Sequence, residues 1–132
     1  MIDYGFYIKC SPIDRSAYKI GIFAMKHADV RIGGYQNSFG PTYKERFEHI
    51  WVGTQADIRE LERLLKIKFR NKIAGNMRGY TEWVQDITYE ELVNEINTLI
   101  HGLGINVINP EKHTQIFESD LVMIKNMYLT SD

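Results

Sequence analysis

Two short segments near the start of the sequence alternate between apolar residues and other residues, and this period of two constrains the fold most. In YGFYIKC, residues 4–10, alternate side chains fall on opposite faces of a β-strand. AYKIGIF, residues 17–23, repeats the pattern after a polar loop that contains a proline. The sequence therefore predicts a β-hairpin whose core face carries Phe6, Ile8, Ile20 and Ile22.

The other face of the predicted hairpin carries Tyr7 and Lys19 beside Gly5 and Gly21. Glycine inside a strand is costly and often marks the close approach of a ligand or another backbone. A lysine near a phenol favours the charged phenolate. This face is therefore either the floor of a polar pocket or an ordinary solvent-exposed face of an antiparallel sheet.

Periodicity beyond the hairpin predicts one further strand and several helices. FEHIWVG, residues 47–53, alternates so that Phe47, His49 and Trp51 share one face. Helical patterns cover residues 26–38, 54–69, 88–100 and 117–129, with a short strand or turn at 81–86 and a possible last strand at 105–109. The fold class predicted is α/β, of the α+β type: a small mixed, largely antiparallel three-stranded sheet flanked by helices.

The helix over residues 54–69 has the clearest signals. Thr54 can cap its start, and Asp57 three residues later makes a variant of the capping box. Ile58, Leu61, Leu65 and Phe69 form its apolar stripe. Glu62 lies at the edge of this stripe, where a carboxylate needs a cation, hydrogen-bond donors or a metal. A salt bridge to Lys66 is the simpler alternative, and Glu60 falls on the solvent side.

Arg31 and Tyr35 are spaced to project from one side of the helix expected over residues 26–38. The arginine guanidinium suits phosphate, and the tyrosine adds a hydroxyl. The alternative is an ordinary amphipathic surface.

The charge of the chain is nearly balanced but unevenly distributed. The net charge is −1, which argues against a strongly basic nucleic-acid binder. A basic cluster nevertheless predicts a local phosphate-binding patch, or else a solvated helix face. Its members are Lys66, Lys68, Arg70, Lys72 and Arg78. Phosphate-loop and dinucleotide-binding motifs are absent, so no nucleotide cofactor is expected.

Cysteine use and hydropathy indicate an intracellular environment. Cys10 is the single cysteine, so a disulfide within the chain and a cysteine metal site are both excluded, and a buried inert thiol is expected. The sequence shows neither a signal-peptide pattern nor an apolar run long enough to span a membrane. We expect a protein of the cytoplasm, or of the host cytoplasm if its source is viral.

The order of these motifs resembles the GIY-YIG nuclease family. Gly5-Phe6-Tyr7 matches the first motif with phenylalanine in place of isoleucine. KIG at residues 19–21 resembles the second motif of the phage-associated branch, in which lysine replaces the tyrosine. RIGGY, the helix segment LERLLKIKF and the pair Glu82-Trp83 follow in the same order. The resemblance runs from about Gly5 to Trp83, and the late asparagine of the family has no clear match.

The resemblance implies divalent-metal-dependent hydrolysis of DNA phosphodiesters. Tyr7 is expected to act as general base, helped by Lys19, and Glu62 to be the single protein ligand of Mg²⁺ or Mn²⁺. Arg31 would neutralise charge on the phosphate, and Tyr35 would hydrogen-bond in the same site.

The resemblance further implies one GIY-YIG-like nuclease domain over residues 1–132, with the motifs in about 4–85. Residues 86–132 would be a helical extension that completes the fold or forms a dimer surface. DNA is the expected partner, and a homodimer is an option. A second interpretation is a catalytically inactive nuclease-fold module that binds nucleic acid or a protein, and a third is an unrelated α/β domain.

Overall fold

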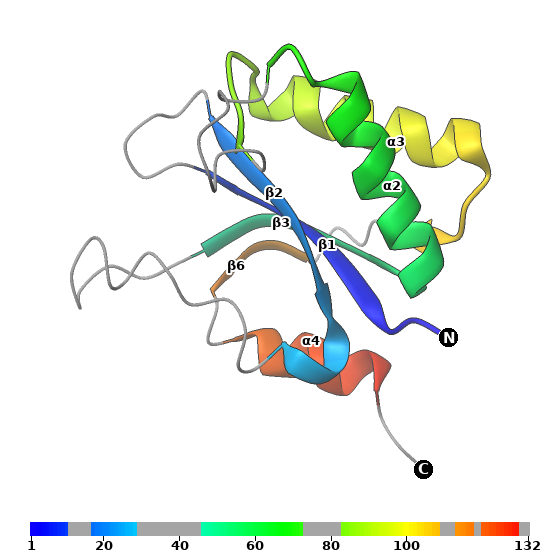
Figure 1. The fold of residues 1–132 in the computed structure, drawn as a ribbon. Helices are drawn as coiled ribbons and strands as arrows, with labels where there is room; N and C mark the ends of the chain where they lie inside the picture. The colour runs from blue at the N-terminus through cyan, green and yellow to red at the C-terminus, as the bar shows by residue number, and fades with distance from the viewer. Residues whose placement is uncertain (11–16, 29–45, 73–82, 109–112, 118–119, 130–132) are drawn as a thin grey trace.

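The chain folds into a mixed α/β structure in which a six-stranded antiparallel sheet lies between two helical layers (Figure 1). The computed structural model describes residues 1–10, 17–28, 46–72, 83–108, 113–117 and 120–129. The strands are β1 Tyr4–Cys10, β2 Tyr18–Ala24, β3 Arg46–Gly53, β4 Trp83–Val84, β5 Val107–Ile108 and β6 Thr114–Phe117. The helices are α2 Gln55–Lys68, α3 Tyr89–Leu103 and α4 Leu121–Tyr128, with a 3₁₀ turn η1 at Met25–His27.

The sheet is larger than the three strands expected from the sequence. Its order is β4-β2-β1-β3-β5, and β6 pairs with β3 as well. Strands β5 and β6 lie along successive parts of β3, since β5 pairs with its end at Val52–Gly53 and β6 with its start at Arg46–His49. The predicted α+β class is therefore confirmed, with additional short strands from the C-terminal part of the chain.

The predicted hairpin is present, and its residues lie on the two faces of the sheet as predicted. Phe6 pairs with Ile22 and Ile8 with Ile20, while Tyr7 pairs with Gly21. Directly paired residues of an antiparallel ladder point to the same face of the sheet. Alternation along the sequence thus assigned both faces of the hairpin correctly.

One face of the sheet packs against α2 and α3, and we call this buried layer the upper core, after its place in Figure 1. Phe6 and Trp51 meet there edge to face, with ring centroids 5.8 Å apart. Trp51 Nε1 donates a hydrogen bond to Oδ1 of Asn97 on α3, at 2.9 Å. The upper core also contains Ile8, Tyr18, Ile20, Ile58, Leu61, Leu65, Phe69, Val84, Ile87, Leu92 and Ile96. Tyr18 is thus a core residue, as the alternation predicted.

The opposite face is also covered, which neither sequence-based interpretation anticipated. It packs against α4 and the 3₁₀ turn, and we call this layer the lower core. Its members are Tyr7, Phe23, Met25, Ala28, Phe47, Ile50, Val52, Leu121 and Ile124. The face that carries Tyr7 is therefore mainly apolar, neither solvent-exposed nor the floor of a polar pocket.

Phe47 corrects a second expectation about faces. Strict alternation along β3 placed Phe47 with Trp51, but Phe47 belongs to the lower core and Trp51 to the upper core. The Phe47 ring lies edge to face against Tyr7, at 5.1 Å between centroids. The alternation therefore fails within β3 between Phe47 and Ile50, which also faces the lower core.

Helix α2 begins where its cap was predicted. Thr54 Oγ1 accepts a hydrogen bond from the Asp57 backbone N–H at 3.3 Å. In the reciprocal half of the predicted capping box the Asp57 carboxylate would accept from the Thr54 N–H. In the structure it accepts from the Asn106 N–H instead, and the Asp3 carboxylate accepts from the N–H of Gln55, the first residue of the helix. The predicted apolar stripe of α2 is buried throughout.

Helix α3 is capped by Thr88. The Thr88 Oγ1 atom accepts a hydrogen bond from the Glu91 N–H at 3.1 Å, and the Thr88 hydroxyl donates to the Glu91 carboxylate at 3.1 Å. Thr88 is thus the residue that caps the helix. Gly104 ends the helix in the left-handed conformation that glycine favours, at φ 63°.

The C-terminal segment completes both layers. The strand expected at residues 105–109 appears as β5, but β6 was not predicted, and α4 begins later than the helix expected from residue 117. The helix expected over 26–38 lies largely outside the described residues; its first part forms the 3₁₀ turn.

Cys10 is half-buried against the upper core rather than fully buried. None of the helices in the described ranges is long and apolar enough to cross a membrane.

The two glycines of the hairpin are explained by aromatic rings from the opposite strand. A Cβ on Gly21 would lie 2.5 Å from Cζ of Tyr7, and a Cβ on Gly5 would lie 2.5 Å from Cε1 of Phe23. The sequence-based interpretation, in which these glycines admit a ligand, is therefore replaced by a packing requirement inside the protein.

We expect Gly21→Ala to destabilise the fold by about 1–3 kcal/mol, because the added methyl group overpacks the Tyr7 ring. Gly102→Ala on α3 is the matched control: nothing lies within 4 Å of its Cβ, so removing a helical glycine should stabilise by about 0.5–1 kcal/mol. Urea unfolding measures both changes. If Tyr7 causes the clash, Gly21→Ala should cost much less in a Tyr7→Ala background, and equal costs in both backgrounds would contradict this explanation.

Candidate functional site

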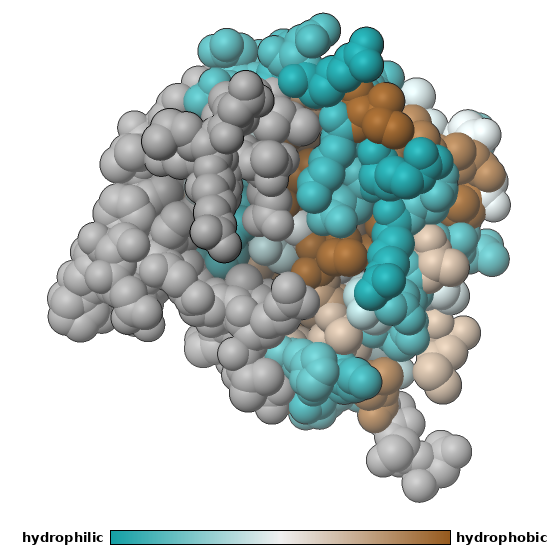
Figure 2. All heavy atoms as spheres, in the orientation of Figure 1, coloured by the Kyte–Doolittle hydropathy of each residue, from teal (hydrophilic) through white to brown (hydrophobic). Residues whose placement is uncertain are grey.

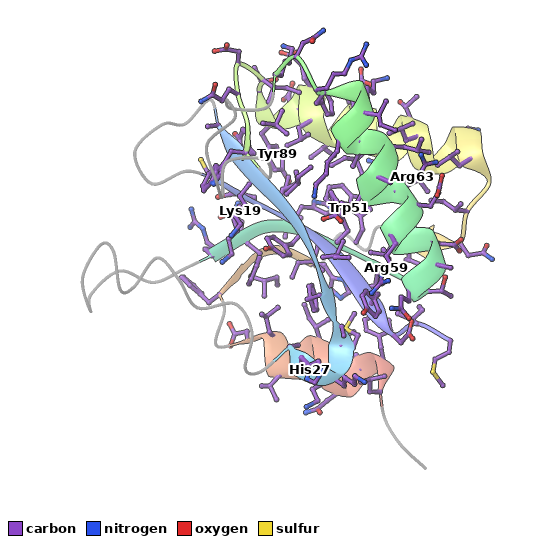
Figure 3. The ribbon with its side chains drawn as sticks, in the orientation of Figure 1. Lys19, His27, Trp51, Arg59, Arg63 and Tyr89 are labelled. Carbon is purple, nitrogen blue, oxygen red and sulfur yellow. The ribbon has the colours of Figure 1, made fainter. Side chains whose placement is uncertain are left out.

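Tyr7 and Lys19 lie on the lower-core face of the hairpin, next to each other across the β1–β2 ladder. Tyr7 pairs with Gly21, and Lys19 is two residues earlier on β2. The Tyr7 side chain is only 7% exposed, whereas Lys19 is half-buried. Figure 3 shows Lys19 to the left of the centre, and Arg59 and Arg63 of α2 to the right. Two of the predicted site residues are therefore neighbours.

Lys9 is a third residue of this group, and sequence reasoning assigned it no function. It pairs directly with Lys19 and is 3% exposed. Its ammonium group lies 4.6 Å from the centroid of the Phe47 ring and 5.7 Å from that of Tyr7. The signal was available, since Lys9 follows Tyr7 by two residues on the same strand face.

Glu62 lies on a helix that packs on the other face of the sheet. Its neighbours Leu61 and Leu65 belong to the upper core, whereas Tyr7 belongs to the lower core. At about 100° per residue, Glu62 and Lys68 flank the apolar stripe of α2 on its two sides, and Lys68 pairs with Glu95 of α3 at 2.6 Å. A site that uses both Glu62 and Tyr7 would have to form around an edge of the sheet.

The alternative interpretation of Glu62 is also present in the structure. Lys66 Nζ lies 3.8 Å from Oε2 of Glu62, the i,i+4 pair expected from the sequence. Glu60 points to solvent and pairs with Arg63, which lowers the pKa of its carboxyl group chiefly through a hydrogen bond. Glu62 is more enclosed than Glu60, since their side chains are 18% and 42% exposed.

The remaining predicted catalytic residues, Arg31 and Tyr35, lie outside the described residues, as do Arg78 of the basic cluster and Glu82. The structure therefore places three of the five predicted catalytic side chains: two adjacent on one face and one on the opposite side of the sheet.

The predicted basic cluster sits at the end of α2 and is partly engaged by neighbours. Lys66 and Lys68 form the ion pairs described above, and Lys72 Nζ donates to the Asp86 carbonyl oxygen at 2.8 Å. Arg70 is exposed. Figure 2 shows hydrophilic side chains gathered over α2.

Arg59 and Arg63 extend this basic surface along α2, at the i,i+4 spacing that places them on one side of the helix. Both are exposed, and Arg59 lies 5.8 Å from the centroid of the Tyr4 ring. The predicted cluster left out both arginines, although their spacing relative to Lys66 was a readable signal.

The resemblance assigns one protein ligand, the Glu62 carboxylate, to a divalent cation. Within the described ranges, no group of three or more histidine, cysteine, aspartate or glutamate side chains could hold a metal ion. A partly exposed carboxylate such as Glu62 supplies the hard oxygen ligand that Mg²⁺ prefers, with waters and phosphate oxygens as its usual other ligands. Glu62 therefore fits the single-ligand role that the resemblance implies.

A separate polar group lies at the start of α3. His49 Nδ1 and the Tyr89 hydroxyl are 3.2 Å apart, and the His49 ring stacks against Trp51 at 4.1 Å between centroids. Burial raises the pKa of the Tyr89 phenol, and the nearby Glu48 carboxylate raises it further. The raised pKa keeps the phenol neutral and able to donate or accept a hydrogen bond.

Comparisons of the chain with known protein families, with curated proteins and with solved structures gave no match.

The pair of Glu62 and Lys66 predicts a small energetic role for Glu62 in folding. An i,i+4 ion pair at a helix surface contributes only about 0.3–0.5 kcal/mol, so Glu62→Gln should change the free energy of unfolding by less than about 1 kcal/mol. Glu60→Gln, which disrupts the solvent-side pair with Arg63, is the control. Urea unfolding of both variants is the measurement, and a loss well above that bound for Glu62→Gln alone would show that its carboxylate anchors the fold.

Proposed function

We propose that the chain is a divalent-metal-dependent endonuclease of the GIY-YIG type that hydrolyses DNA phosphodiester bonds. The observation that carries the proposal is the hairpin register. The tyrosine of the first motif lies over the glycine of the second motif, with Lys19 of that motif alongside. Two motifs read separately from the sequence therefore meet at one place on the sheet.

In this proposal the Tyr7 phenolate takes a proton from the attacking water, and Lys19 favours the phenolate form through its positive charge. Arg31 neutralises charge that grows on the phosphate, and Tyr35 hydrogen-bonds in the same site. Glu62 would hold Mg²⁺ or Mn²⁺, which when bound stabilises the leaving oxygen. The basic residues of α2 would contact the DNA backbone away from the reacting phosphate.

One such site cuts one strand at a time. Cutting both strands would then require a homodimer or two successive nicks. Strands β5 and β6 and helix α4 add to the sheet and the lower core, which supports the option in which the C-terminal segment completes the fold.

Two observations favour the alternative, an inactive module that binds nucleic acid or a protein. Tyr7 is 7% exposed and packed against aromatic rings, and Glu62 already has Lys66 as a neighbour. A cleavage assay with and without metal separates the two functions directly.

Supercoiled plasmid should be nicked in the presence of Mg²⁺ or Mn²⁺ and left intact in EDTA. Glu62→Ala should abolish nicking because it removes the proposed metal ligand. Glu60→Ala, on the solvent side of the same helix, should leave the rate within about twofold, an allowance that corresponds to well under 1 kcal/mol. Gel electrophoresis over time gives both rates. Full activity of Glu62→Ala would refute the metal assignment, and no nicking by the unmodified chain would favour the binding module.

Tyr7→Phe tests the general base without emptying the lower core. Removing a general base typically slows the reaction about 10²–10⁴-fold, and we expect a loss in this range in kcat. The phenylalanine keeps the ring that packs against Phe47, so thermal unfolding should be nearly unchanged. Tyr4→Phe is the control on the same strand. A Tyr7→Phe variant that cuts at the normal rate would remove Tyr7 from the mechanism.

A further inference from the structure

Helix α2 and the turn after it form a positively charged segment of a nearly neutral chain. Residues 55–72 contain six lysines and arginines but only three aspartates and glutamates. This segment therefore carries a charge of +3, while the net charge of the chain is −1 and that of the remaining residues is −4. A local positive field of this kind attracts polyanions even where the protein as a whole is slightly acidic.

The helix divides these cations between two sides. At about 100° per residue, Arg59, Arg63 and Lys66 fall within about 60° of one another around the axis of α2. They lie on the same side of the apolar stripe as Glu62, whereas Lys68 lies on the other side. Figure 3 shows Arg59 and Arg63 on successive turns of the helix. We call Arg59, Arg63 and Lys66 the basic ridge of α2.

The basic ridge is accessible, and its acidic neighbours are surface groups of the same helix. Arg59 is exposed, and the side chains of Arg63 and Lys66 are 59% and 35% exposed. Arg63 pairs with Glu60. Lys66 lies 3.8 Å from Glu62. Ion pairs at an exposed surface contribute little and are screened by salt, and these two carboxylates only partly offset three cations. A polyanion therefore binds the ridge without any of its side chains having to be unpaired.

The length of the ridge suits a nucleic-acid backbone. From Arg59 to Lys66 the helix rises about 10 Å, at about 1.5 Å per residue. One strand of a duplex carries a phosphate about every 3.4 Å along its axis, so a backbone that runs along the ridge presents about three phosphates to its three cations. An extended acidic peptide turns a side chain to one face only about every 6.6 Å and offers about half as many charges. Arginine also supplies a planar donor fork that suits phosphate.

We propose that the basic ridge is a docking surface for consecutive backbone phosphates of one DNA strand. The ridge borders Glu62 on α2, so a strand docked there would lead toward that carboxylate. It differs from the basic cluster expected from the sequence, because it includes Arg59 and Arg63 and leaves out Lys68. A surface for polyanions follows from the helix alone, whereas its assignment to DNA rests on the proposed function.

The test is the salt dependence of binding to a short DNA duplex in EDTA, measured by fluorescence anisotropy. Loss of one phosphate contact lowers the slope of log K against log salt by about 0.9. Arg59→Gln and Arg63→Gln should each lower the slope by about this amount, and the double variant by about 1.8. Glutamine retains helix propensity and both sites are exposed, so thermal unfolding should show that the variants are folded.

Lys68→Gln is the matched control on the other side of α2. Lys68 belongs to the basic cluster expected from the sequence but pairs with Glu95 of α3, so its loss should leave the slope nearly unchanged. An equal loss of slope in Lys68→Gln would return the contact to that cluster and overturn the ridge. Unchanged slopes in both arginine variants would overturn it as well. If one arginine variant does not fold, the other decides alone.

The nature of the partner and the fate of the proposed enzyme are separated by two further outcomes. A polyglutamate peptide of the same total charge as the duplex should compete poorly for the ridge. Competition as strong as that of unlabelled duplex would assign the ridge to an acidic protein and overturn the DNA assignment. Ridge-dependent DNA binding without nicking in Mg²⁺ keeps the docking surface and removes the enzyme. Nicking with a salt slope that does not depend on the ridge does the reverse.

Discussion

Two glycines covered by aromatic rings fix the geometry on which the rest of this fold depends. Phe23 of β2 lies over Gly5 of β1, and Tyr7 of β1 lies over Gly21 of β2. A one-residue slip of the ladder would exchange the two faces of a strand and would set each ring against a residue that has a Cβ. The reciprocal pairs therefore select one register, and that register is what places Lys19 opposite Lys9.

The second constraint is that both faces of the sheet are used for packing. Helices α2 and α3 cover the upper core, and α4 with the 3₁₀ turn covers the lower core. A hairpin enclosed on both sides has little room for polar groups, so a cationic pair there is unusual. Lys9 and Lys19 lie near the end of β1 and the start of β2, where the hairpin meets its loop. Any chemistry on this face is therefore confined to that end of the hairpin.

Local periodicity predicted what depends on neighbours in sequence, and it failed where distant segments decide. The strands of the hairpin, the upper-core stripe of α2 and the cap at Thr54 follow from patterns within about a dozen residues. The lower core does not, because α4 joins it from a distant part of the chain: the hairpin ends at Ala24 and α4 begins at Leu121. That Tyr7 and Lys19 share one face of the hairpin was predictable for the same reason as the strands. The face on which Glu62 lies was not, since packing decides on which side of a sheet a helix lies.

The position of Glu62 sets a specific requirement for the proposed chemistry. Tyr7 and Lys19 lie on the lower face of the sheet and Glu62 on the helix above the upper face, so in the proposed mechanism a phosphate shared by all three would have to pass around β2. Strand β4 pairs only with Tyr18 and Lys19 of β2, and in the described part of the chain no strand lies outside the rest of β2. The substrate backbone would cross the sheet there. A nuclease site built from these residues would thus be an edge site, in which the Tyr7 phenol and the carboxylate proposed to hold the metal would approach one phosphate from the two faces of β2.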